Sequence, residues 1–135
     1  MREIPVTFTD ACAQAILAGR KTQARRVVRD PDEACPFGEP GDRLWLREAQ
    51  DMTREQARVV LEVEGTCREP LQDISDQDLA AEGDVSGEPF VDAGERRQIF
   101  ASWWNGVHHR PGTKWADAPE VWVVRFRRVA SPAPR

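Results

Sequence analysis

The 135-residue chain has a formal net charge of −4, with 40% hydrophobic and 31% charged residues. Compact domains most often contain about 100 to 150 residues, so we expect a single globular domain over 1–135, with an ordered core at about 4–129 and a disordered tail at 130–135. The sequence contains no run of about 18 apolar residues, and its first ten residues lack the apolar stretch of a secretory signal. These features argue against an integral membrane protein and predict a cytoplasmic protein with no membrane partner.

Charge is distributed unevenly along the chain. Residues 62–95 contain eleven Asp and Glu against one basic residue, Arg68, so this segment has a local charge of −10 and the remainder sums to +6. Such a division predicts a domain with one positive face, in which the acidic stretch lies away from a polyanion or covers it. A solvated acidic helix and loop would account for the same segment equally well.

The potential metal-binding side chains are few and scattered. Cys12, Cys35 and Cys67 are far apart, odd in number and without a CxxC pair, which indicates neither a disulfide framework nor a zinc site. The only histidines, His108 and His109, are adjacent and therefore point in different directions, and no third ligand lies near them in the sequence. We therefore expect no metal and no cofactor.

The first third of the chain predicts a strand, a helix and a second strand. "IPVTFT" (4–9) alternates and is rich in β-branched residues, which favours a short strand. "TDACAQAILAG" (9–19) combines an N-cap, an alanine-rich body and a terminal glycine, which predicts a helix of about ten residues. The pattern then shifts to a period of two in "KTQARRVVR" (21–29), which ends in two valines and predicts a strand followed by a turn-rich loop over 30–42.

The remainder predicts two strands, two helices and a last strand. Alternating residues favour strands over 43–49 and 57–69, whereas "ISDQDLAAEGDV" (74–85) has the N-cap and terminal glycine of a short helix. Apolar residues at helical spacing predict a longer helix over 92–107, and both faces of the last strand, 119–129, are largely apolar. This order has no βαβ rhythm and predicts an α+β domain built on a small, curled antiparallel or mixed sheet.

Five fragments in this order resemble one known family. "ILAGRKTQARR", "PGDRLWLRE", "LAAEG", "FASWWNGV" and "WVVRFRRV" are similar to segments of the ASCH domain, in its bacterial and phage-borne single-domain branch, over about 4–129. The resemblance implies a PUA-like fold, a small β-barrel flanked by helices. Some small bacterial members are amidohydrolases that remove the acetyl group from N4-acetylcytidine, and at least one other member is reported as a ribonuclease.

The resemblance also implies candidate catalytic residues. In the amidohydrolase branch these are a lysine and a threonine of a "KTxT" segment and a glutamate of the later helical segment. Lys21 matches the lysine, and Glu82 of "AAEG" is the best match to the glutamate. Ala24 stands where the family has its second threonine, which puts a threonine nucleophile in doubt. Thr22 lies on the same strand face as Ala24, where it would either replace the nucleophile or only pack.

Strand alternation adds candidate substrate-binding residues. Arg25 is predicted to share a face with Lys21 and with the glutamine between them. Trp45 could stack on a pyrimidine, and Arg47, followed by Glu48, could meet a carbonyl or a phosphate. Core packing explains Trp45 equally well, and a solvated cation at a helix C-terminus is the alternative for Lys21.

These residues suggest a metal-independent amidohydrolase acting on N4-acetylcytidine or a related N4-acylated or modified pyrimidine nucleoside. In this hypothesis Lys21 and Glu82 do the chemistry in a nucleoside-sized pocket. The alternatives are a non-catalytic module that binds RNA or a modified base, and a ribonuclease that uses His108 or His109. The loop "NGVHHRPGTKW", in which basic and aromatic residues alternate, could touch a phosphate backbone. The expected partner is a small nucleoside-like substrate, with RNA as a further candidate, and the expected assembly is a monomer or weak dimer.

Overall fold

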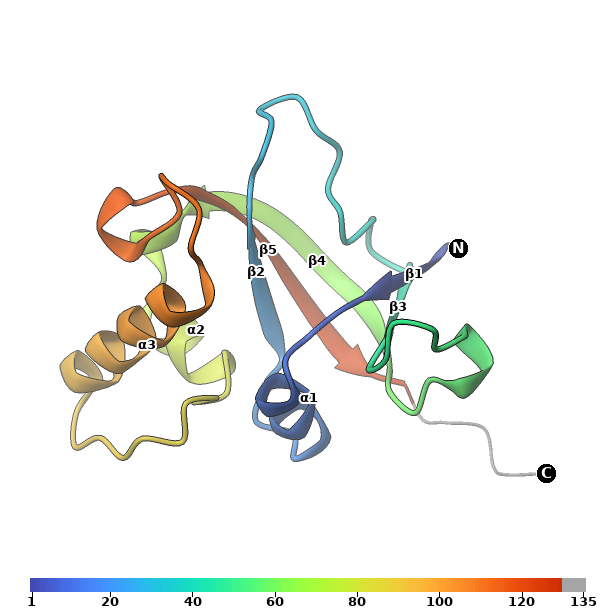
Figure 1. Cartoon of the computed structure of the whole chain (residues 1–135), viewed down its shortest axis with the longest axis horizontal. Helices are drawn as coiled ribbons and strands as arrows, with labels where there is room; N and C mark the ends of the chain where they lie inside the picture. Colours follow the sequence, from blue (N-terminus) through green and yellow to red (C-terminus); the bar gives the residue numbers. More distant parts are fainter. Residues whose placement is uncertain (130–135) are drawn as a thin grey trace.

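A mixed five-stranded sheet in the order β1-β3-β4-β5-β2 forms the centre of the computed structural model, which describes residues 1–129 (Figure 1). The strands are β1 (Glu3–Val6), β2 (Gln23–Val27), β3 (Arg43–Leu46), β4 (Val60–Pro70) and β5 (Glu120–Arg128). The α-helices are α1 (Asp10–Leu17), α2 (Asp76–Ala81) and α3 (Ala93–Val107), and short 3-10 turns occupy Arg54–Gln56, Leu71–Asp73 and Trp115–Asp117. The predicted α+β class is confirmed; the predicted tail, 130–135, lies outside the described residues.

The sheet is not closed, so the expected barrel is corrected to an open, mixed sheet. Within residues 1–129, β1 pairs only with β3, in parallel, and β2 pairs only with β5, in antiparallel. The connection between the two edge strands is α1, and its residues Ala13 and Ile16 belong to the same apolar core as Val6 of β1 and Ala24 of β2. The helix therefore fills the side of the sheet at which the edge strands of a barrel would pair.

Several element boundaries differ from the sequence-based expectation. The first strand ends at Val6, and β2 begins at Gln23, two residues later than predicted. The backbone N–H groups of Lys21 and Thr22 donate to the carbonyl oxygens of Ala15 and Ala81 instead of to a neighbouring strand. These two residues therefore form a connection that the helix termini hold in place. No helix within 1–129 has the length and apolar character required to cross a membrane.

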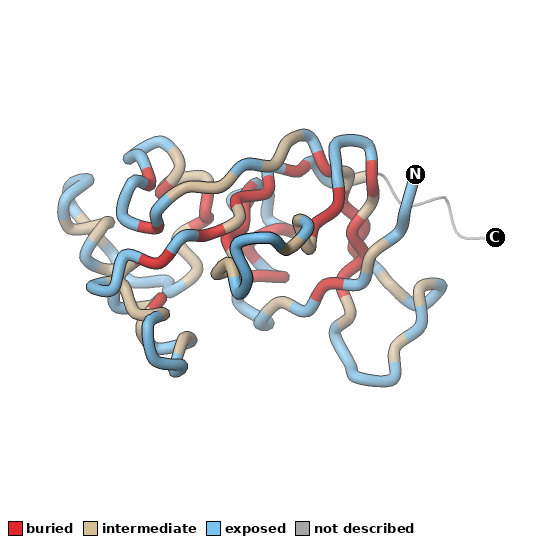
Figure 2. Tube along the Cα trace, turned by 90° about the horizontal axis from the view of Figure 1, so that it is seen from above, coloured by how far each residue is buried: buried red, intermediate tan, exposed pale blue. Residues whose placement is uncertain are grey.

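Two apolar cores lie on opposite faces of β5. Val124 and Phe126 belong to a core that includes α1 and the strands β1, β3 and β4, whereas Val121 and Val123 belong to a second core beneath α2 and α3. Trp104 of α3 is buried in the second core. Figure 2 shows the buried stretches gathered along the central strands. Both faces of β5 are covered, as its apolar pattern predicted.

Candidate functional site

Lys21 is buried in an ion pair rather than solvated at a helix end. It is 3% exposed, and its Nζ lies 2.8 Å from Oε1 of Glu82, which is also 3% exposed. The same Nζ donates to the backbone carbonyl of Glu82 at 3.3 Å. The alternative of a solvated cation at the end of α1 is therefore wrong for Lys21. A buried ammonium facing a buried carboxylate is the arrangement that the active-site hypothesis requires.

Arg25 binds the second oxygen of the same carboxylate. Its NH1 lies 2.7 Å from Oε2 of Glu82 and also donates to Oε1 of Gln23 at 2.9 Å, and its side chain is fully buried. Its NH2 lies 3.3 Å from Glu69 Oε1 and 3.4 Å from Asp78 Oδ2. The amide of Gln23 donates to Asp78 Oδ1 at 2.8 Å. We call these residues the charge cluster: Lys21, Gln23, Arg25, Glu69, Asp78 and Glu82.

Three residues of the charge cluster share one face because side chains alternate along β2 and the two residues before it. Lys21, Gln23 and Arg25 project to one face, whereas Ala24 between them packs into the apolar core on the other. The predicted shared face of Lys21 and Arg25 is therefore confirmed. Two cations and one amide therefore lie on one short segment, and their acidic partners come from β4, from α2 and from the residue that follows α2.

Glu82 reaches Lys21 because the C-terminal turn of α2 docks on the chain before β2. The N–H of Thr22 donates to the carbonyl of Ala81 at 2.8 Å, and Nε of Arg20 donates to the carbonyl of Gly83 at 3.4 Å. Gly83 has a φ of +95°, and a Cβ built on it would lie 2.8 Å from Cβ of Lys21. Only glycine permits both this backbone conformation and this approach, so Gly83 sets the distance between α2 and Lys21.

A β-bulge brings Glu69 to the charge cluster. The pairing of β4 with β5 shifts between Val63 and Gly65, so Val63 lies opposite Phe126 and Gly65 lies opposite Arg125. An extra residue in one strand exchanges the faces of all residues beyond it. Glu69 consequently lies on the same sheet face as Arg25, and without the bulge it would point to the opposite face.

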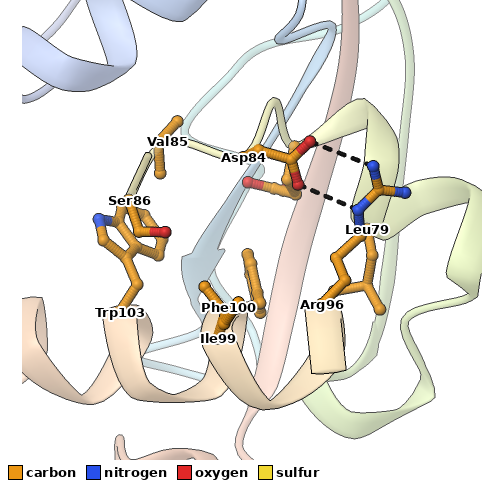
Figure 3. A pocket seen from close by; sticks show the side chains of 9 residues that line it. Leu79, Asp84, Val85, Ser86, Arg96, Ile99, Phe100 and Trp103 are labelled. Atoms are coloured by element: carbon orange, nitrogen blue, oxygen red, sulfur yellow. Dashed lines mark hydrogen bonds and ion pairs between the residues drawn. The ribbon is translucent and has the colours of Figure 1, made fainter. Parts of the chain in front are cut away.

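Glu82 lines only a small cavity, to which neither Lys21 nor Arg25 contributes. The cavity that Glu82 lines has a volume of about 20 Å³ and is bordered by the loop after α2 and by α3 (Figure 3). A cavity needs about 10 to 15 Å³ to hold one water molecule, so this one accommodates a water and not a nucleoside. The expected nucleoside-sized pocket is therefore absent at this point of the described chain. Asp84 in the loop forms an ion pair with Arg96 of α3 at 3.0 Å, which fastens the loop over the cavity.

Thr22 is not brought to the charge cluster. Its side chain is exposed, because alternation turns it away from the face that carries Lys21 and Gln23. Its backbone is instead used for structure, with its N–H bound to Ala81 and its carbonyl accepting from the N–H of Phe126 at 3.1 Å. Thr22 therefore does not lie beside Lys21 and Glu82 in the position of a nucleophile.

The three residues expected on the third strand form a different surface. Trp45 is buried, the guanidinium of Arg47 lies 6.0 Å from the centre of its ring, and Glu48 forms an ion pair with Arg58 at 2.7 Å. Arg47 and Glu48 line an open groove with Thr7, Ala49 and Gln50 that shares no residue with the charge cluster. In the sheet order, β4 and β5 separate their strand from β2. These residues are therefore not assembled with Lys21 and Glu82.

The carboxylates and imidazoles do not form a metal site. Among residues 1–129, no group of three or more His, Cys, Asp or Glu has an arrangement that could hold a metal ion. The acids of the charge cluster face Lys21 and Arg25 instead. His108 stacks on Trp104, with 3.7 Å between ring centres, and its Nδ1 lies 2.9 Å from the carbonyl oxygen of Trp104. Burial lowers the pKa of His108, which favours a neutral ring.

Comparison with solved structures identifies the architecture. An ASCH domain from Lactobacillus crispatus superposes with a TM-score of 0.58 at 14% identity, over 94% of this chain and 79% of the other. A DUF984 protein from Enterococcus faecalis gives a TM-score of 0.63 at 14% identity, over 96% and 77%. The chain has the ASCH-domain fold. An ASCH protein from Zymomonas mobilis matches with a TM-score of 0.51 at 16% identity, over 93% and 67%. No protein-family model and no curated protein matches the sequence.

Three residues of this ASCH fold were not predicted as site residues. The sequence predicts Asp78 only as part of a short helix and Glu69 only as part of a strand, yet both contact Arg25. Gly83 had been assigned as a helix terminator, whereas it also packs directly on Lys21. The excess of acid over 62–95 was the available signal, since a segment with that charge must find cations in a folded domain.

Proposed function

We propose that this protein belongs to the ASCH family and is an amidohydrolase that removes the acyl group from N4-acylated cytidine. The fold and the ordered motifs support the family, and the buried pair of Lys21 and Glu82 supports the chemistry. A carboxylate and an ammonium held 2.8 Å apart in a nearly dry site can supply a general base and a cation for a developing oxyanion. The pair of Lys21 and Glu82 is the observation that carries the proposal.

The reaction uses a water molecule as nucleophile, because Thr22 faces away. Glu82 accepts a proton from water in the adjoining cavity, and the water oxygen forms a bond to the acyl carbonyl carbon. The ammonium of Lys21 stabilises the negative charge that develops on the carbonyl oxygen. Glu82 then returns the proton to N4 of the base as the C–N bond breaks, which releases cytidine and the free carboxylic acid. Arg25 orients the carboxylate through its other oxygen.

Substrate entry requires the loop over the cavity to move. Asp84, Val85 and Ser86 face the α3 residues Arg96 and Trp103 across the cavity (Figure 3). Asp84 and Arg96 are both partly exposed, and an exposed ion pair contributes about 0 to 1 kcal/mol. The ion pair itself therefore opposes opening of the loop only weakly, and opening would extend the water-sized cavity towards α3.

The test is release of cytidine from N4-acetylcytidine by the purified protein, followed by chromatography. We expect turnover by the wild type and a loss of about 100-fold or more in Glu82→Gln, which keeps the shape but removes the base. Glu62→Gln is the matched control, because Glu62 pairs with Arg127 at the surface, and its turnover should equal that of the wild type. Absence of turnover by the folded wild type, or full activity of Glu82→Gln, would overturn the proposal.

A second candidate is a module that binds RNA or a modified base without chemistry. Both carboxylate oxygens of Glu82 are occupied by cations, and the adjoining cavity holds only a water, which favours a structural charge cluster. This candidate predicts binding of N4-acetylcytidine or a short RNA without product release. Equilibrium binding measured beside the turnover assay separates the two candidates.

A further inference from the structure

A second, strongly basic groove lies at the edge of the sheet. It has a volume of about 680 Å³ and runs between the C-terminal end of β2 and the segment that follows α3. Small-molecule sites typically have volumes of about 300 to 1,000 Å³, so this groove is large enough for a ligand. We call it the basic groove, and its lining residues that carry or can carry positive charge are Arg26, Arg29, His108, His109 and Arg110. No Asp or Glu contributes to its lining in the described part of the chain.

The arginines of the basic groove have no carboxylate partner. Across residues 1–129, nine arginines form ion pairs and seven form none, and three of these seven, Arg26, Arg29 and Arg110, line the basic groove. Asp30, Asp32 and Glu33 follow Arg29 in the sequence, but none of them forms an ion pair with it in the described chain. The carboxylate of Glu33 instead accepts from the backbone N–H of Arg29 and from Nε1 of Trp122. The guanidinium groups are therefore left for a ligand from outside the described chain.

Like charges gather in the basic groove at an energetic cost. Burial lowers the pKa of Arg26, and the positive charge of Arg29 lowers it further, whereas the nearby Cys35 and Glu33 act in the opposite direction. The guanidinium of Arg26 lies 5.0 Å from the ring centre of Phe37, which holds it in place from one side. A bound anion would reduce the electrostatic repulsion between Arg26 and Arg29. The groove is therefore expected to bind negatively charged groups.

Apart from Thr113, the remaining wall residues are apolar. Val107 is 42% exposed, one of few large apolar side chains exposed in residues 1–129, and it lines the groove with Val27 and Pro111. The ring of His108 is fixed by its stack on Trp104. Guanidinium groups with an apolar wall suit an anion attached to a flat or apolar body, and arginine binds phosphate with paired hydrogen bonds.

We propose that the basic groove binds phosphate esters of nucleotides, either a free nucleotide or the backbone of a single nucleic-acid strand. The groove shares no lining residue with the charge cluster, so it is a separate site and its occupancy does not depend on the amidohydrolase proposal. Three unpaired guanidinium groups can neutralise about two to three phosphates, whereas the overall charge of −4 disfavours a long polyanion. The ligand is therefore either a short nucleotide or a strand of which only about two to three phosphates contact the groove.

The experiment measures binding of a fluorescein-labelled single-stranded RNA of about ten nucleotides by anisotropy, with cytidine 5′-monophosphate and cytidine as competitors. The test variant is Arg29→Ala/Arg110→Ala. The matched control is Arg43→Ala/Arg128→Ala, which removes two other arginines that form no ion pair within the described residues and lie outside the groove. Turnover of N4-acetylcytidine is measured in parallel and should be equal in all three proteins.

We expect the test variant to bind the RNA at least about tenfold more weakly, and the slope of log affinity against log salt to fall by about 1.4, or 0.7 for each lost phosphate contact. The control should bind like the wild type. Competition by the monophosphate but not by cytidine supports a free nucleotide, and competition by neither supports the strand backbone. Failure of the wild type to bind either phosphate ligand, or equal loss in the control, would overturn the proposal.

Discussion

Glu82 is the residue on which the charge cluster depends, because each of its carboxylate oxygens faces a different buried cation. Removing one partner of a buried ion pair leaves the other charge uncompensated and typically costs about 3 to 5 kcal/mol. Replacing such a pair by apolar side chains is often neutral or stabilising. A cluster of this kind is therefore weakly explained by stability alone, which is consistent with a functional role for its charges.

Gly83→Ala tests the close approach between α2 and Lys21. The new Cβ would lie 2.8 Å from Cβ of Lys21, at a backbone φ of +95° that disfavours alanine. We expect the free energy of unfolding to fall by about 1 to 3 kcal/mol, measured by urea denaturation. Gly106→Ala is the control, because nothing lies within 4 Å of its new Cβ and alanine favours a helix, so stability should hold or rise. A neutral Gly83→Ala would contradict this packing.

His108 should titrate below the ordinary histidine value. Burial lowers its pKa, so the folded protein prefers the neutral ring and the unfolded chain binds the proton more readily. The contribution of His108 to stability is therefore fully present above about pH 6.5 and is lost as the pH falls through the lower folded pKa. NMR titration of the ring is the measurement, with a midpoint below about 6.5 expected. A midpoint at or above that value would show that the ring is solvated.

The elements show which parts of the site could be predicted. The cap of α2 and its terminal glycine are local signals, so the helix that carries Glu82 was predictable, and alternation on β2 correctly paired Lys21 with Arg25. The only local signal for the bulge in β4 is the isolated Gly65, which does not fix how the faces of the strand exchange, and the bulge decides that Glu69 faces Arg25. The start of β2 was also missed, because the partner of the Thr22 N–H is a carbonyl in a distant helix.

Asp84→Asn tests whether the loop after α2 controls entry to the cavity. Asp84 has a φ of 50°, a conformation that asparagine tolerates, so the change removes the ion pair with Arg96 without new backbone strain. We expect faster amide hydrogen exchange in 84–92 and a rise in kcat/KM for N4-acetylcytidine of up to about fivefold, which corresponds to about 1 kcal/mol. A fall in kcat/KM with faster exchange would show that the closed loop is needed for turnover.

The division of charge along the chain organises the whole molecule. The acidic segment supplies Glu69, Asp78 and Glu82 to the charge cluster, where they meet Lys21 and Arg25. The acidic stretch therefore does more than form a solvated face. Arginines at the far side of β2 are left without such partners, and they make the basic groove.

The α+β fold class could be predicted from the sequence, but whether the sheet closes into a barrel could not. Element order gave the α+β class, whereas the open edge between β1 and β2 depends on how α1 packs between them. Packing of this kind is tertiary information, which hydrophobic periodicity does not contain.

The most direct measurement compares stability with turnover in Lys21→Met, Glu82→Gln and the double variant. The double variant removes both members of the buried pair, so we expect it to recover part of the free energy of unfolding that either single variant loses. We also expect its kcat/KM for N4-acetylcytidine to stay about 100-fold or more below that of the wild type, because the base and the oxyanion cation are both gone. Turnover that returns together with stability would contradict a catalytic charge cluster.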